Sequence, residues 1–219
     1  MDKVKRLLAL FEKMPPRLDE AFNELRNDSY TSEEMMAALC GFAGICDSEY
    51  ADLYRERQKE PKPEELRASY IYPICEMLLK SGMDPNTVAD GENIMFLLPE
   101  IGGKNLGAKT MRLLLENGGD LDLKIDGESV FEQADSDLLF DVTELEDRGL
   151  FDCEFRVWLT LIGFGAKTSE GGSPIKIKEG YDASNFKQFE KFSYKIEFLD
   201  GDWKMRIFDD EINREVAGL

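Results

Sequence analysis

Apolar positions recur at helical spacing through the first 80 residues of the chain. In residues 4–11 they fall on one face, because side chains three and four apart lie on the same side of an α-helix. The same spacing continues over about 16–27 and 31–57, and again over 64–80. We therefore predict that the N-terminal third is helical throughout.

Signals for helix ends stand at the expected places in this region. Pro15-Pro16 ends the first helix and suits the first turn of the second. Thr31 and Glu34 have the spacing of a capping box, in which each side chain satisfies a backbone N–H of the first turn. Gly82 follows the fourth helix and can adopt the left-handed conformation that ends a helix. The predicted boundaries therefore rest on caps as well as on periodicity.

The C-terminal segment changes to a period of two, which is typical of strands. Apolar residues alternate with polar ones over 192–198 and again over 203–207, and Asp200-Gly201 stands between them as a turn. We predict a β-hairpin here, with 211–217 as a third strand. An isolated hairpin is only marginally stable in water, so Trp203 and its alternating neighbours should pack on the preceding helices.

Between the first helices and the hairpin, the sequence repeats itself at an offset of 36 residues. Residues 77–86 (MLLKSGMDPN) match 113–122 (LLLENGGDLD), and 90–94 (DGENI) match 126–130 (DGESV). A weaker third copy, 161–167 (LIGFGAK), follows after an insertion. Similarity at a fixed period indicates a supersecondary unit that stacks on copies of itself.

The repeated residues resemble the ankyrin repeat, a unit of about 33 residues that consists of a turn and two antiparallel helices. They match the leucines, the glycine-x-aspartate and the aspartate-glycine turn of that family at Leu78-Leu79, Gly82-Met83-Asp84, Asp90-Gly91, Leu114-Leu115, Gly118-Gly119-Asp120 and Asp126-Gly127. The family's Thr-Pro-Leu-His turn is replaced by residues 93–96 and 129–132, so its usual hydrogen-bond network is not expected. The resemblance covers about 64–178 and implies stacked helix pairs that bind other proteins.

These patterns together predict a mainly α chain. Residues 1–63 form a helical N-terminal cap, 64–178 an ankyrin-like α-solenoid of stacked antiparallel helix pairs, and 179–219 a small C-terminal β-hairpin or sheet packed on the repeats. Each helix pair buries its apolar face on the next, which leaves the turns in a row on one edge. No apolar run approaches the roughly 20 residues of a membrane span, and no cleavage site follows the N-terminal apolar stretch. A cytoplasmic protein without membrane contact is expected.

The composition offers few of the side chains that enzymes and metal sites use. The chain has no histidine, which removes the commonest general base and metal ligand. Asp120 and Asp122 suggest a calcium loop, but Lys124 and Ile125 stand where such a loop needs an acid and a glycine. The cysteines lack the close pairs of a zinc site and are predicted to be reduced core thiols: Cys40, Cys46, Cys75 and Cys153. We expect no metal, no cofactor and no enzymatic activity.

Negative charge is the feature that bears most on function. The net charge is −18, which argues against nucleic-acid binding because a protein must bring cations to the phosphates. Residues 116–147 hold twelve acids and one base, Lys124. Such a run is usually a solvated face, yet like charges this close repel one another and weaken the folded state. The concentration is more readily explained if something positive binds there.

The predicted function is therefore a non-enzymatic protein–protein interaction module, whose turns and inner helices present a concave acidic surface to a basic protein partner. The candidate partner-binding residues are the acids of the repeated turns: Asp90, Glu92, Asp120, Asp122, Asp126 and Glu128. A narrower form of the hypothesis is an inhibitor or immunity-type protein that neutralises a basic toxin or nuclease. The alternatives are a carboxylate-based hydrolase and a structural component that oligomerises through the edge of its C-terminal hairpin.

Overall fold

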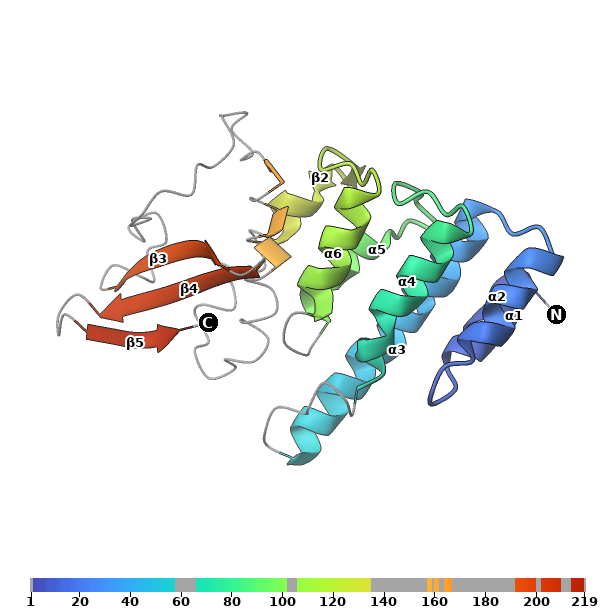
Figure 1. Cartoon of the computed structure of the whole chain (residues 1–219), viewed down its shortest axis with the longest axis horizontal. Helices are drawn as coiled ribbons and strands as arrows, with labels where there is room; N and C mark the ends of the chain where they lie inside the picture. Colours follow the sequence, from blue (N-terminus) through green and yellow to red (C-terminus); the bar gives the residue numbers. More distant parts are fainter. Residues whose placement is uncertain are drawn as a thin grey trace.

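The computed structural model of the chain is mainly α-helical (Figure 1). It describes residues 2–57, 66–101, 106–134, 157–158, 160–161 and 164–166, and the backbone of the strands 192–199, 202–209 and 214–218. The helices are α1 (Lys3–Phe11), α2 (Leu18–Asn27), α3 (Ser32–Arg57), α4 (Ile71–Lys80), α5 (Ile94–Leu97) and α6 (Leu106–Glu116), with the 3₁₀ segments η2 (Arg67–Tyr70) and η3 (Leu98–Glu100). A further helical turn covers 130–134.

The first three predicted helices are confirmed, and the fourth is corrected. The predicted capping box is present: the Glu34 amide donates to Thr31 Oγ1 at 3.1 Å, and the Thr31 amide donates to Glu34 Oε2 at 2.9 Å. The helix predicted over 64–80 is α-helical only from Ile71. The described residues before it are Leu66 and the 3₁₀ segment η2. Tight 3₁₀ turns are common at helix starts, and the α-helical spacing of apolar residues does not distinguish them.

The helices pack in chain order around one hydrophobic core (Figure 1). α1 contacts α2 and α3, α3 also contacts α4 and α5, and α4 contacts α6. Between α1 and α3, the Phe11 and Phe42 rings meet edge to face with their centroids 6.1 Å apart. Farther along the chain, Phe131 and Trp158 stack at 6.2 Å. Apolar side chains from the N-terminal helices and from the repeated segment therefore share a single cluster.

Three segments of the repeat end in the same hydrogen-bonded cap. Gly82, Gly118 and Gly165 have φ of +98°, +95° and +94°, a conformation that costs glycine little. After each glycine, the next amide donates to a carbonyl five residues back, over 2.9–3.0 Å: Met83 to Leu78, Gly119 to Leu114, and Ala166 to Leu161. This is the Schellman pattern. Gly82 and Gly118 end helices as predicted, and the weaker third copy shares their cap.

The two Asp-Gly pairs form equivalent turns, as the 36-residue offset predicts. Asp90 and Asp126 both have φ of +53°, and the glycines that follow have +86° and +93°. Positive φ at both central positions is the mark of a type I′ hairpin turn, for which Asp-Gly is a preferred pair. The second turn joins the short strands β1 (Lys124–Ile125) and β2 (Glu128–Ser129), whereas the first has one bridge between Ala89 and Glu92.

The predicted C-terminal hairpin is present in the backbone. β3 (Phe192–Leu199) pairs antiparallel with β4 (Asp202–Asp209), and β5 (Arg214–Gly218) pairs with the other edge of β4. The sheet order is β3-β4-β5, with a register shift between Ile207 and Phe208. The predicted packing of Trp203 on the helices concerns side chains outside the described part of the chain. No helix in the described ranges is long and apolar enough to cross a bilayer.

Gly107 allows α6 to approach its neighbours closely. A Cβ atom at this position would lie 2.3 Å from the Leu98 carbonyl oxygen of η3 and 3.2 Å from Val157 Cγ2. We expect Gly107→Ala to lower the free energy of unfolding by roughly 1–3 kcal/mol, the usual range for overpacking. Gly44→Ala in α3 is the matched control, because its Cβ would meet nothing within 4 Å. This control should be neutral or stabilising by up to about 1 kcal/mol, from helix propensity alone. Urea unfolding of both variants tests the pair, and equal effects would contradict the assigned contact.

Candidate functional site

The two hairpin turns present carboxylates at matching positions. Asp90 and Asp126 occupy the first central position of their turns, and Glu92 and Glu128 follow each glycine. All four side chains are exposed. Within the described part of the chain, none of the four carboxylates makes a hydrogen bond or an ion pair. The turns therefore hold unneutralised negative charge on a backbone of fixed shape.

The loops that precede the turns use their aspartates for local structure. Asp84 Oδ1 accepts the Asn86 amide, and Asp120 Oδ1 accepts the Asp122 amide, both at 2.9 Å. These are Asx turns, in which the side chain replaces a backbone acceptor. Of the predicted partner-binding residues, Asp120 thus has a structural role in its own loop. Asp122 is exposed, and its carboxylate has no partner among the described residues.

Successive loops are joined by polar side chains. Asn86 donates through Nδ2 to the Gly118 carbonyl at 2.9 Å, and its Oδ1 accepts the Asp120 amide at 2.6 Å. Nearer the N-terminus, Ser32 Oγ accepts the Asp84 amide at 2.8 Å. Asp84 and Asp120 are equivalent by the 36-residue offset, so the same backbone position is held twice from the preceding unit. The links place neighbouring loops, and the acids they carry, in a fixed register.

Each turn is followed by a helix start that is capped by a side chain. Asn93 is fully buried: its Nδ2 donates to the Pro85 and Thr87 carbonyls, and its Oδ1 accepts the Met95 amide, each at 2.8 Å. This side chain thus links the loop before the first turn to the start of α5. At the equivalent position, Ser129 forms a capping box with the carboxylate three residues on.

The base within the acidic block is engaged inside the second turn. Lys124 Nζ lies 3.6 Å from Glu132 Oε2 and donates to the Gly127 carbonyl at 3.3 Å. The Ser129 amide, which donates to the Glu132 carboxylate, is the largest cause that lowers the pKa of Glu132. The charges of Lys124 and Glu132 thus offset each other, and among the described residues Lys124 forms no ion pair with the exposed acids of the turn. Residues 135–147, the rest of the acidic block, lie outside the described residues.

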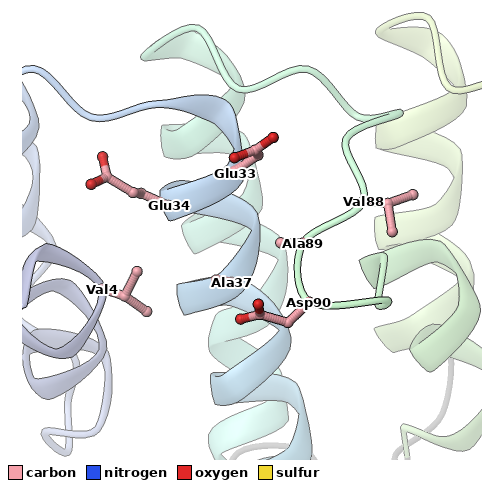
Figure 2. A pocket seen from close by; sticks show the side chains of 7 residues that line it. All are labelled: Val4, Glu33, Glu34, Ala37, Val88, Ala89 and Asp90. Carbon is pink, nitrogen blue, oxygen red and sulfur yellow. The ribbon is translucent and has the colours of Figure 1, made fainter.

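A shallow groove of about 330 Å³ lies beside the first turn (Figure 2). We call it the Ala37 groove; it is lined by Val4, Glu33, Glu34, Ala37, Val88, Ala89 and Asp90. Val4 comes from α1, the next three residues from the start of α3, and the last three from the hairpin turn. The groove brings together Asp90, which was predicted as a site residue, and two acids that were not, Glu33 and Glu34. Their signal in the sequence was a capping box, which pointed only to a helix start.

The described cysteines have the environment of core thiols. Cys40, Cys46 and Cys75 are buried and form no disulfide. Desolvation is the largest cause that raises the pKa of each to about 12, so they are thiols rather than reactive thiolates at neutral pH. Cys153 lies outside the described residues. Within the described ranges, no three His, Cys, Asp or Glu side chains are grouped to hold a metal ion.

Comparison with protein-family models, curated proteins and solved structures found no match to this chain. Function is therefore inferred from its own residues. Asp90, Glu92, Asp120, Asp122, Asp126 and Glu128 all lie on exposed loops or turns.

Proposed function

We infer that the chain is a non-enzymatic protein-interaction module that presents its acidic turns to a basic protein partner. The observation that carries this proposal is the pair of type I′ turns, 36 residues apart, that share one backbone conformation. Each turn exposes an aspartate and a glutamate without a partner in the described part of the chain. Solubility alone needs charge but no repeated geometry, whereas recognition needs charge in a defined place.

An ankyrin-like stack is the architecture that suits this role. On this proposal, α3 with α4, and α5–η3 with α6, are successive helix pairs, so the first pair begins within the segment 1–63 that was predicted as the N-terminal cap. Contacts of α3 with α5 and of α4 with α6 support the assignment, as do the caps at Gly82 and Gly118. Packed helices lie about 8–10 Å apart, so successive turns would stand about 10 Å apart. A peptide in the polyproline II conformation rises about 3.1 Å per residue with three residues per turn, so its cations at every third position would lie on one face, about 9 Å apart, and would meet successive turns.

The expected benefit of such a surface is fast capture. Complementary charge raises the rate of diffusional encounter more than it raises the final affinity. A basic toxin or nuclease would gain most from this steering, because its own cationic surface is built for phosphates. An inhibitor or immunity-type role is therefore the narrower form of the proposal.

The test is salt dependence of a defined interaction. The tagged full chain would be used to capture proteins from its native cell at low salt, and the salt eluate identified and purified. Association kinetics of the purified partner would then be measured at about 50 and 300 mM salt. We expect a basic partner whose association rate falls by about tenfold or more, because the Debye length shortens below the spacing of the charges. A salt-independent rate with an equally tight complex would place the partner site away from the acidic turns.

A further inference from the structure

The Ala37 groove combines an apolar floor with a negatively charged rim. Val4, Ala37 and Ala89 supply the apolar surface, and carboxylates stand around it at Glu33, Glu34 and Asp90 (Figure 2). The hollow exists because position 37 holds the small side chain of alanine between α1 and the turn. Three separate elements enclose it, so its shape depends on the folded stack rather than on one loop.

The rim carries charge that the fold does not use. Glu34 accepts the Thr31 amide at 2.9 Å and lies 3.9 Å from Lys3 Nζ, so it belongs to the cap of α3. Lys3 is also held by Asp28 at 3.3 Å. Glu33 and Asp90 have no hydrogen bond or ion pair within the described ranges. Two carboxylates from different elements therefore stand free beside one apolar hollow.

The equivalent helix start in the next unit lacks these acids. α3 follows its cap residue Thr31, and α5 follows Asn93. Counted from the caps, Met95 and Phe96 correspond to Glu33 and Glu34, and they are 0% and 5% exposed. At the third cap, Ser129, Phe131 corresponds to Glu33 and is 2% exposed, whereas Glu132 corresponds to Glu34 and closes the same kind of capping box. Glu34 thus belongs to a cap that another helix start shares, and Glu33 is the acid that stands where the other two helix starts bury an apolar side chain.

A ligand that matches the groove needs an apolar stem and a cationic head. Lysine and arginine side chains have this form, since their methylene stems lie on apolar surface while the charged end stays among polar groups. The volume of about 330 Å³ is at the lower limit of small-molecule pockets, which span roughly 300–1,000 Å³. The groove is therefore large enough to admit one such side chain. We propose that the Ala37 groove anchors a lysine or arginine side chain of the basic partner, an assignment that rests on the proposed function.

Methyl NMR of the full chain tests the assignment without the partner. The probes are the capped tripeptides acetyl-Gly-Arg-Gly-amide and acetyl-Gly-Lys-Gly-amide, with citrulline in place of arginine as the neutral isostere. The methyl groups of Val4, Ala37 and Ala89 report on the groove, and buried Val130 is the reference. We expect saturable shifts of the three groove methyls with arginine or lysine and much weaker ones with citrulline. Equal binding of citrulline, or shifts no larger than that of Val130, would overturn the assignment.

Two variants separate the rim from the floor. Exposed ion pairs are individually weak, so Glu33→Gln with Asp90→Asn should weaken arginine-peptide binding about fivefold. The charge-matched control, Glu12→Gln with Glu56→Gln at exposed positions outside the proposed binding surface, should leave it unchanged. Ala37→Gln keeps the charge but fills the hollow, and should abolish the shifts at Val4 and Ala89. Unchanged peptide binding in both groove variants would contradict the proposal.

Failure here can be told apart from failure of the proposed function. If the partner shows salt-dependent capture but the groove variants bind it and the peptides as the wild type does, only the anchor assignment is wrong. If no basic partner is captured while the groove methyls still respond to arginine, the proposed function fails and the groove retains its preference for cationic side chains.

Discussion

Replacing Asn93 with alanine is expected to lower the free energy of unfolding by about 3 kcal/mol. The substitution removes a helix cap, which costs about 0.5–2 kcal/mol. It also leaves the buried Pro85 carbonyl and the part-buried Thr87 carbonyl without the Nδ2 donor that lies 2.8 Å away, and a buried unsatisfied group costs about 1–3 kcal/mol. For a chain of this length the melting temperature should fall by roughly 10 °C. Urea unfolding and thermal melting followed by circular dichroism both measure the effect.

The equivalent position in the next unit provides the matched control. Ser129 caps its helix through one hydrogen bond from the Glu132 amide, and within the described ranges its side chain makes no hydrogen bond to the loop before it. Ser129→Ala should therefore cost only about 1 kcal/mol. Asn93→Ser should fall between the two, because it restores the cap without the two donors. If Asn93→Ala and Ser129→Ala destabilised the chain equally, the loop contacts of Asn93 would contribute nothing to stability.

The sequence predicted local structure well wherever a residue type has a steep conformational preference. Gly82 and Gly118 end helices, and Asp90-Gly91 and Asp126-Gly127 form turns, because positive φ restricts these positions to a few residue types. Because the two copies are 36 residues apart, each assignment in one copy also predicted the matching position in the other. The alternating pattern at the C-terminus likewise predicted β3, β4 and β5. Periodicity did not distinguish the 3₁₀ segment η2 from an α-helix.

The sequence does not predict which distant segments of the chain lie side by side in the fold. The Ala37 groove depends on contact between α3 and a loop about 50 residues later, as in the bond from the Asp84 amide to Ser32, 52 positions apart. Nothing local to Glu33 shows that a turn will stand beside it. The sequence around Asn93 indicates no structural role for it, because two of its three hydrogen-bond partners lie in the preceding loop. The acids of the turns could be predicted as site residues from the sequence. The sequence could not distinguish Asp120, which has a structural role, from its neighbours without partners.

Charge reversal at three turn positions should slow partner capture by at least about tenfold. Glu92→Lys, Asp122→Lys and Glu128→Lys alter exposed carboxylates that have no partner within the described part of the chain. Asp120 is left intact because it accepts the Asp122 amide, and Asp126 because its φ of +53° favours aspartate. Steering acts on encounter, so the association rate should fall much more than the dissociation rate changes. Stability should shift by less than about 0.5 kcal/mol per site.

The control reverses the same amount of charge at the far ends of the helices. Glu12 follows α1, and Asp47 and Glu56 lie in the C-terminal half of α3; all three are exposed acids. Since a helix rises 1.5 Å per residue, Glu56 lies about 35 Å from the start of α3. Lysine at these three positions raises the net charge equally but lies several Debye lengths from the turns at physiological salt. Association kinetics of both variants at two ionic strengths decide the matter. Equal slowing by the two variants would mean that net charge alone drives capture, and that the repeated turns are no binding surface.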